Sequence, residues 1–295
     1  MRLTFNALDD GLAAIDAAAG QLQTAQWQVS TGRRIRVPSD DPAAAQAAVV
    51  LQSEIGTLDA YTRSGDTADA HLAALDTTLG DIVDKLTQAL SVATGARGDT
   101  PDQPSRDAAS ATLAGIRDAL ADNVNSRFDG GYLFAGTQST TAPYAKVGGV
   151  WTYQADSTPM LVEVARDRTV AFTMDGQAIF QGSDPADVLT TLDGLVAAVA
   201  TGDNVAIGAG IDALQRAFSR AVRAQSQVGA DQTTLADCRQ RVHALGRDAA
   251  ARLSSAQDAN LADAITRMRQ ADTTYRAALG AVAASEKVSL LDYLR

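Results

Sequence analysis

The sequence predicts a mainly α fold with a small inserted β domain, built as an elongated rod of long helices. One observation is an apolar stripe near the N-terminus that advances by three or four residues: Phe5, Leu8, Leu12, Ile15, Ala19, Leu22, Gln26 and Val29. A second stripe with the same spacing lies near the C-terminus: Leu261, Ile265, Met268, Tyr275, Leu279 and Val282. The third observation is composition, because 46% hydrophobic but only 5% aromatic residues suit closely packed long helices.

The two stripes predict helices over residues 4–31 and 258–292 that pair as an antiparallel coiled coil. Steps of three and four residues average 3.5, the period at which two helices can wrap around each other. No proline interrupts either range, although Asp272 interrupts the second stripe. The alternative is two unrelated amphipathic helices on one globular core, since short heptad runs are common in helical proteins.

A short joint is expected on each side of this pair. Gly32 can end the first helix in the left-handed conformation, and Asp41-Pro42 is a strong helix start because the carboxylate accepts free N–H groups. The first joint comprises Gly32, Arg33, Arg34, Pro38, Asp40, Asp41 and Pro42, and residues 254–258 form the second. Arg33, Arg34 and Arg36 allow a nucleic-acid or phosphate site. In so acidic a chain we favour pairing with Asp40, Asp41 or a neighbouring subunit's carboxylates.

Between the joints the sequence predicts a bundle of long helices. Residues 42–94 form one very long helix, or two with a soft break near Ser64-Gly65, and Leu72, Leu75 and Leu79 mark its inner face. A turn rich in Gly and Pro over 95–104 leads into a returning helix. Later helices are expected over 185–200, starting at Asp184-Pro185, and over 204–253.

A β-rich segment interrupts this bundle. Residues 131–183 hold short runs of alternating and β-branched residues, with Asp175-Gly176 as a hairpin turn. We therefore predict three domains: 1–31 with 258–295 as the terminal assembly domain, 32–130 with 184–257 as the helix bundle, and 131–183 as an inserted outer domain. The sequence identifies no ligand for the outer domain.

Composition and motifs argue against catalysis, cofactors and metals. The net charge of −10 and the pI of about 4.6 argue against a nucleic-acid partner. Cys238 is the only cysteine and is interpreted as a packed small side chain, its role otherwise open. There is no phosphate-binding loop, nucleophile elbow or zinc motif, and no apolar run long enough to span a membrane. Asp9, Asp10 and Asp16 interrupt any signal-peptide core.

Assembly is the function that remains. The first helix carries apolar groups on nearly every side and needs burial on several sides, which neighbouring copies can supply. The predicted assembly interface comprises Phe5, Leu8, Leu12, Ile15, Leu22, Val29, Leu261, Ile265, Met268, Tyr275, Leu279, Val282, Leu290 and Leu294. The sequence does not give the number of subunits or the side that each neighbour contacts.

Three segments resemble the flagellin superfamily, and within it the branch of hook-associated protein 3, the hook–filament junction proteins. Residues 29–42 read VSTGRRIRVPSDDP, residues 125–135 read NSRFDGGYLFA, and residues 253–295 run from LSSAQDANLADAI to SLLDYLR. The resemblance implies a structural part of the bacterial flagellum that joins the hook, through hook-associated protein 1, to flagellin. It also implies a ring of identical subunits, type III export without a cleaved signal peptide, and an export chaperone that binds the C-terminal helix over 261–282.

The alternative within the superfamily is a filament subunit. Typical flagellins carry Gln-Ala-Asn-Gln near the C-terminus, whereas this chain has Gly280-Ala281-Val282-Ala283. The β-rich insertion is also short. Both departures favour the junction branch. Alternatives from another class are a helical enzyme or an adhesin that binds through the β domain.

Overall fold

The computed structural model describes residues 2–98 and 101–293, with side chains over 9–98 and 101–284. Contacts divide the chain into two compact units: the first is Met1–Thr57 with Leu245–Arg295, and the second is Leu58–Ala244. The boundaries fall inside two long helices rather than in loops. The three-domain division predicted from the sequence stays a proposal.

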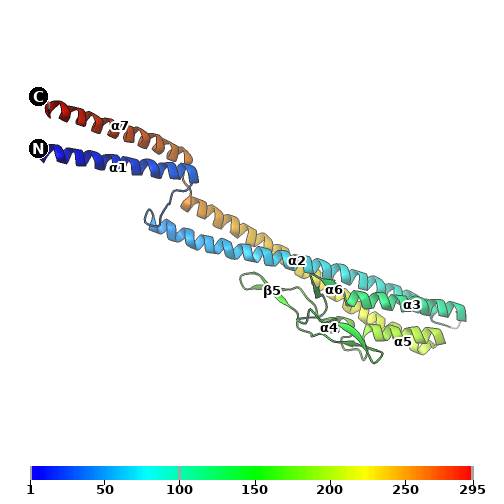
Figure 1. Ribbon diagram of the computed structural model, residues 1–295. Coiled ribbons are helices and arrows are strands. Elements are labelled where there is room, and N and C mark those ends of the chain that lie inside the picture. The colour runs from blue at the N-terminus through cyan, green and yellow to red at the C-terminus, as the bar shows by residue number, and fades with distance from the viewer. Residues whose placement is uncertain (1, 99–100, 294–295) are drawn as a thin grey trace. The chain divides into compact units, whose positions relative to one another are not determined.

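The first unit contains the two terminal helices. Helix α1 spans Arg2–Thr31 and helix α7 spans Leu261–Tyr293, close to the predicted ranges. They lie side by side and run in opposite directions, with the N- and C-terminal ends of the pair together (Figure 1). The pairing of the chain ends therefore has the expected direction, whereas the supercoiling of a true coiled coil stays a prediction.

The second unit is built from long helices around one apolar core. Its helices are α2 (Pro42–Ala96), α3 (Gln103–Val124), α5 (Val188–Thr201) and α6 (Asn204–Gln257), of which α2 and α6 also extend into the first unit. The predicted leucine series of α2 is fully buried in the core, including Leu72, Leu75 and Leu79. Helix α2 runs through Ser64-Gly65 without a break. A side chain at Gly65 would lie 3.2 Å from Arg239 of α6, so this glycine allows close helix packing.

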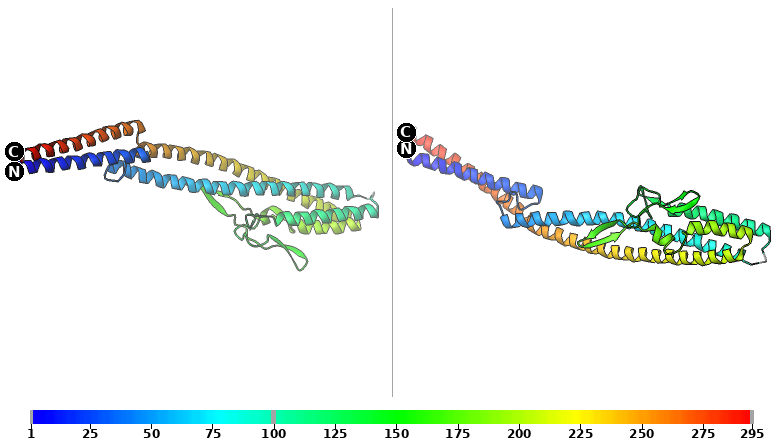
Figure 2. Two further views of the ribbon diagram at one scale, coloured as in Figure 1. Left: turned by 45° about the horizontal axis from the view of Figure 1, so that its top comes forward. Right: turned by 90° about the horizontal axis from the view of Figure 1, so that it is seen from below.

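The β-rich segment consists of three separate antiparallel hairpins rather than one sheet (Figure 2). Each hairpin is short, with strands of two to five residues. The strands are β1 (Arg127–Phe128) with β2 (Gly131–Tyr132), β3 (Tyr144–Val147) with β4 (Val150–Tyr153), and β5 (Leu161–Ala165) with β6 (Arg168–Ala171). The prediction of a mainly helical chain with a small β-rich insertion is confirmed.

The predicted hairpin turn at Asp175-Gly176 is wrong. Asp175 caps the short helix α4 (Gly176–Phe180), because its carboxylate accepts a hydrogen bond of 2.8 Å from the N–H of Gln177. The hairpin of β5 and β6 closes instead at Asp167, which adopts a left-handed φ of 59° without a glycine. An Asp-Gly pair serves a helix cap as well as a turn, so local sequence did not decide between them.

The predicted helix start at Asp184-Pro185 is also wrong. Helix α5 begins at Val188, and the buried carboxylate of Asp187 accepts hydrogen bonds of 2.9 Å from the N–H groups of Leu189 and Thr190. Asp184 pairs instead with Arg216 and Arg220 of α6, at 2.7 Å each. These arginines lie about 30 residues further along the chain, beyond the reach of a local pattern.

Candidate functional site

The most buried residues of the terminal helix pair are alanines. Ala18 and Ala25 of α1 are 4% and 5% exposed, and Ala264 and Ala271 of α7 are 0% and 7% exposed. Each pair is separated by seven residues, two helical turns, so each helix presents one row of methyl groups. We call these four residues the alanine seam. Small side chains at these positions allow the two helices to pack closely, and Val282 of α7 packs against Gly11 of α1 in the same contact.

Larger apolar side chains lie beside the alanine seam and remain exposed. Leu12 and Leu261 are each 52% exposed, Leu279 is 42% and Ile265 is 38% exposed. Ile15, Leu22, Met268, Tyr275 and Val282 are half-buried. At about 100° per residue, the α1 members lie on one side of Ala18, and the α7 members other than Val282 lie on one side of Ala264. Val282 is in line with Ala264 and packs against Gly11 of α1. We call the eight residues other than Val282 the apolar flank.

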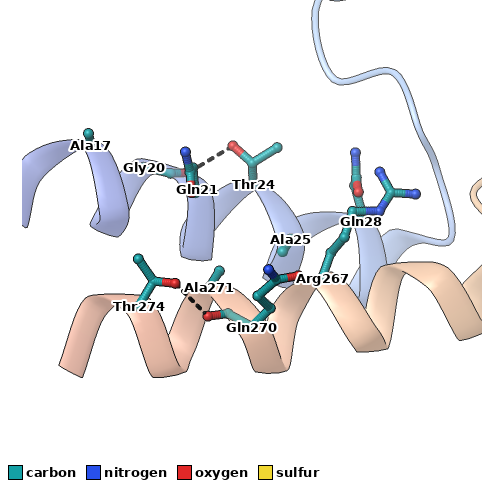
Figure 3. Close-up of a pocket in the computed structure, with 10 residues that line it drawn as sticks. All are labelled: Ala17, Gly20, Gln21, Thr24, Ala25, Gln28, Arg267, Gln270, Ala271 and Thr274. Carbon is teal, nitrogen blue, oxygen red and sulfur yellow. Dashed lines mark hydrogen bonds between the residues drawn. The ribbon is translucent and has the colours of Figure 1, made fainter. Parts of the chain in front are cut away.

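A polar groove of about 690 Å³ lies on the other side of the alanine seam (Figure 3). Two threonines in it donate hydrogen bonds of 2.9 Å to carbonyls of their own helices, Thr24 to Gly20 and Thr274 to Gln270. The side-chain amide of Gln28 donates to the carbonyl of Arg34 at 3.2 Å. Its lining residues are Ala17, Gly20, Gln21, Thr24, Ala25, Gln28, Arg267, Gln270, Ala271 and Thr274.

The terminal pair therefore has two chemically different faces. The residues that line the groove come from both helices and lie on one side of the alanine seam. On each helix, the flank residues lie in the opposite direction around the helix axis. Because the helices are antiparallel, the apolar flanks of α1 and α7 share the opposite face. An apolar surface on one face of a soluble protein is typical of a surface that another molecule covers.

The structure describes most residues of the predicted assembly interface. Those of the apolar flank are described above, Val282 packs against Gly11 between the helices, and Val29 is half-buried at the end of α1. The side chains of Phe5, Leu8 and Leu290 and the whole of Leu294 lie outside the described residues. Large apolar residues dominate the two stripes of the sequence, so the alanine seam was not predicted. The seven-residue spacing of these alanines was the signal that could have identified it.

Charge is divided unevenly between the two units. The first unit contains 11 basic and 12 acidic residues, a net charge of −1, whereas the second contains 14 basic and 23 acidic residues, a net charge of −9. The unit with the exposed apolar flank is therefore almost neutral. Copies of this unit can approach without the self-repulsion that the second unit would produce.

The joint beside the terminal pair is held by backbone hydrogen bonds. Gly32 ends α1 with a left-handed φ of 69°, as expected. The N–H of Arg34 donates to Gln257 at 2.7 Å, and the N–H of Ala259 donates to Gly32 at 2.7 Å, so Arg33 and Asp258 form an antiparallel bridge. The segments before α2 and after α6 are thereby fastened together within the first unit.

One arginine fixes the side chains of the joint. The Arg34 guanidinium donates at 3.0 Å to Asp41 and at 3.0 Å to the carbonyl of Ala256. Asp41 also caps α2 through the N–H of Ala44, as predicted for Asp41-Pro42, and this backbone hydrogen bond, with Arg34, lowers the pKa of its carboxyl. Pro38 is exposed. A role for these residues as a joint between domains stays a proposal.

The other charges of the joint are used differently. Asp40 accepts hydrogen bonds from the N–H groups of Val37 at 3.0 Å and Arg36 at 2.9 Å, which lower the pKa of its carboxyl. The expected pairing with Asp40 or Asp41 is found for Arg34 only. Within the part of the chain that the structure describes, the exposed guanidinium groups of Arg33 and Arg36 have no ion-pair partner.

Other kinds of site find little support in the described ranges. Within residues 2–98 and 101–293, no three His, Cys, Asp or Glu side chains come close enough to hold a metal ion. Across the same residues, no helix has the length and apolar character needed to cross a membrane. Cys238 is buried in α6, in keeping with its interpretation as a packed small side chain.

The chain is similar to components of the bacterial flagellum. Residues 9–139 match the family model of the bacterial flagellin N-terminal helical region. Two curated relatives are named flagellar hook-associated protein 3. The one from Escherichia coli is 29% identical over 157 residues, which are 51% of this chain and 50% of the relative. The one from Salmonella typhimurium is 30% identical over 202 residues, which are 61% of this chain and 63% of the relative.

A solved structure shares the fold. A candidate flagellar hook-associated protein from Vibrio parahaemolyticus aligns with a TM-score of 0.71 at 20% identity, covering 74% of this chain and 100% of that chain. The resemblance to the flagellin superfamily inferred from the motifs is confirmed by these matches, which support a structural role in the bacterial flagellum. The chain spans only 50% and 63% of the two curated relatives.

Proposed function

We propose that this chain, which carries the flagellin N-terminal helical region, joins the flagellar hook to the filament and self-assembles through its terminal helices. The names of the curated relatives place those proteins at the hook. The observation that carries the proposal for this chain is the apolar flank on a unit with a net charge of only −1. A surface of this kind gains free energy when a neighbour covers it.

The proposed neighbours follow from the resemblance described above. They are further copies in a ring, hook-associated protein 1 on the hook side and flagellin on the filament side. Before assembly, an export chaperone covers the apolar side chains of 261–282, and the chain leaves the cell through the flagellar type III apparatus. The joint of Gly32, Arg34 and Asp41 supports this arrangement, because its hydrogen bonds give the terminal pair a defined attachment.

Deletion of either terminal helix tests the site of assembly. Removing residues 1–31 or 258–295 should leave a soluble, folded second unit, because its apolar core is formed within Leu58–Ala244. The truncated chain should no longer join flagella in a strain that lacks the gene. A truncated chain that still supports filament growth would refute assembly through the terminal helices.

Imaging separates the junction from the alternative. A junction protein forms a short ring at the hook end, and its loss leaves hooks in place while flagellin is shed into the medium. The alternative is a filament subunit, which the match to the flagellin N-terminal helical region also supports. Polymers of filament length formed by this chain would establish that alternative and contradict the junction.

A further inference from the structure

We propose that neighbouring copies meet edge to edge, with the acidic outer edge of α1 in one copy against the basic outer edge of α7 in the next. The proposal rests on self-assembly through the terminal helices and names the contact that performs it. The occupant of each edge is a second copy of this chain. Charge complementarity and matched spacing along the two helices support this contact.

The acidic edge consists of Asp9 and Asp16 of α1. Both are exposed, and among the described residues neither has an ion-pair or hydrogen-bond partner. At about 100° per residue they lie roughly 160–180° from Ala18, on the side of α1 that faces away from α7. No Lys or Arg occurs between residues 9 and 31. This edge therefore presents uncompensated negative charge.

The basic edge consists of Arg269 and Arg276 of α7. Both are exposed, and they lie roughly 120–140° from Ala264, on the outer side of α7 next to the apolar flank. Arg276 contacts Asp272 at 3.1 Å, but their side chains are 76% and 42% exposed, so a better-placed carboxylate can replace this pair. The outermost residues between and beside the arginines are small, including Thr273 and Gly280, which permits close approach of another helix.

The two edges match in spacing and direction. Asp9 and Asp16 are seven residues apart, as are Arg269 and Arg276, and seven residues rise about 10 Å along a helix. When two copies lie side by side in the same direction, α1 of one runs antiparallel to α7 of the next. Asp9 then meets Arg276 while Asp16 meets Arg269. A contact between different edges can repeat from copy to copy.

The register of this contact differs from the register within one copy. In one copy, a side chain at Gly11 would lie 2.8 Å from Val282, so positions whose numbers sum to 293 are level. In each proposed charge pair the two residue numbers sum to 285, which is eight less. The neighbouring copy is therefore shifted along the helix axis by about 12 Å, at about 1.5 Å per residue. Leu12, between the two acids, is covered in the same contact.

Charge exchange tests the contact with the full-length chain. One variant carries D9R and D16R, and the other carries R269D and R276D. Each alone should self-associate about tenfold more weakly than the unmodified chain in sedimentation experiments, because like charges then face each other. An equimolar mixture should recover, since every contact again joins opposite charges. A chain with all four changes should also recover. The difference should shrink at high salt.

Specific outcomes would overturn this edge contact. If both variants associate as tightly as the unmodified chain, the edges are not the contact. If both fail and the mixture does not recover, the edges do not bind each other, and each meets a different partner. In either case Leu12→Asp should still abolish association, so self-assembly through the terminal helices would stand. If Leu12→Asp associates normally, or the unmodified chain stays monomeric, the proposed function itself fails. Equal helical melting curves show that each variant is folded.

Discussion

Replacing Leu12 by aspartate should abolish assembly while leaving the isolated protein folded. Leu12 is 52% exposed, so about half of its burial remains to be gained when a neighbour covers the apolar flank. Full burial of a leucine contributes roughly 1.5–3 kcal/mol. The missing half corresponds to about 1 kcal/mol for each contact, or about fivefold in the association constant.

A carboxylate at position 12 adds a larger cost. Burying an unpaired charge costs several kcal/mol, enough to prevent the contact, whereas Leu12→Ala loses only the apolar part and weakens it about fivefold. In the isolated chain the carboxylate stays in water, so the free energy of unfolding should fall by about 1 kcal/mol or less. The order of assembly strength is therefore unmodified, then alanine, then aspartate.

The assay compares unfolding with association for the same variants. Circular dichroism during urea unfolding gives the stability of the isolated chain, and sedimentation gives self-association. A matched control is Val205→Asp, because Val205 is 84% exposed at the start of α6 in the second unit. The control should assemble normally. Normal assembly of Leu12→Asp would refute this prediction, as would a loss of assembly by the control to the same extent.

Three further predictions concern local structure. Arg34→Met removes the pair with Asp41 and should cost about 0.5–1 kcal/mol, since the pair is partly exposed; faster hydrogen exchange at the joint amides would show this, and unchanged protection would count against it. Gly210→Ala should cost about 1–3 kcal/mol in urea unfolding, because the new Cβ would lie 2.5 Å from Leu195; a stabilised variant would mean that Leu195 gives way. Burial between two phenylalanine rings lowers the pKa of His71 below 6.5, so the stability that it contributes is present above about pH 6.5 and is lost as the pH falls toward the folded-state pKa. His71→Leu should flatten this dependence in thermal melts at several pH values, and an unaltered pH profile would contradict it.

The long helices could be predicted because their signals are local and repeated. Helix α1 ends at Gly32 and α2 begins at Pro42, where the sequence contains a residue suited to each position. Apolar periodicity extends over many turns in α2 and α6, so single glycines did not mislead the prediction. The direction of the terminal pair also followed, since a joint was expected at a matching place beside each stripe.

The local predictions were wrong where a residue contacts a part of the chain that is distant in sequence. Asp184 looked like a helix cap, but two arginines of α6 use its carboxylate. Asp175-Gly176 looked like a turn, but a side chain at Gly176 would lie 2.8 Å from the carbonyl of Phe134, so the glycine allows backbone approach instead. Tertiary packing decided both cases.

The candidate site was predictable in part. Large side chains of the stripes were correctly placed on the terminal helices. The most buried residues in the contact between the helices are nevertheless Ala18, Ala25, Ala264 and Ala271. Alanine carries little weight in a hydrophobic pattern, because it suits both buried and exposed helix positions. Only the packed pair distinguishes the seam from the flank.

The most direct measurement is an electron microscopy reconstruction of the assembled hook–filament junction containing this chain. Self-assembly through the terminal helices predicts that Leu12, Ile265 and Leu279 are buried between neighbouring copies. A reconstruction in which these side chains face solvent, while copies contact each other only through residues 58–244, would contradict it.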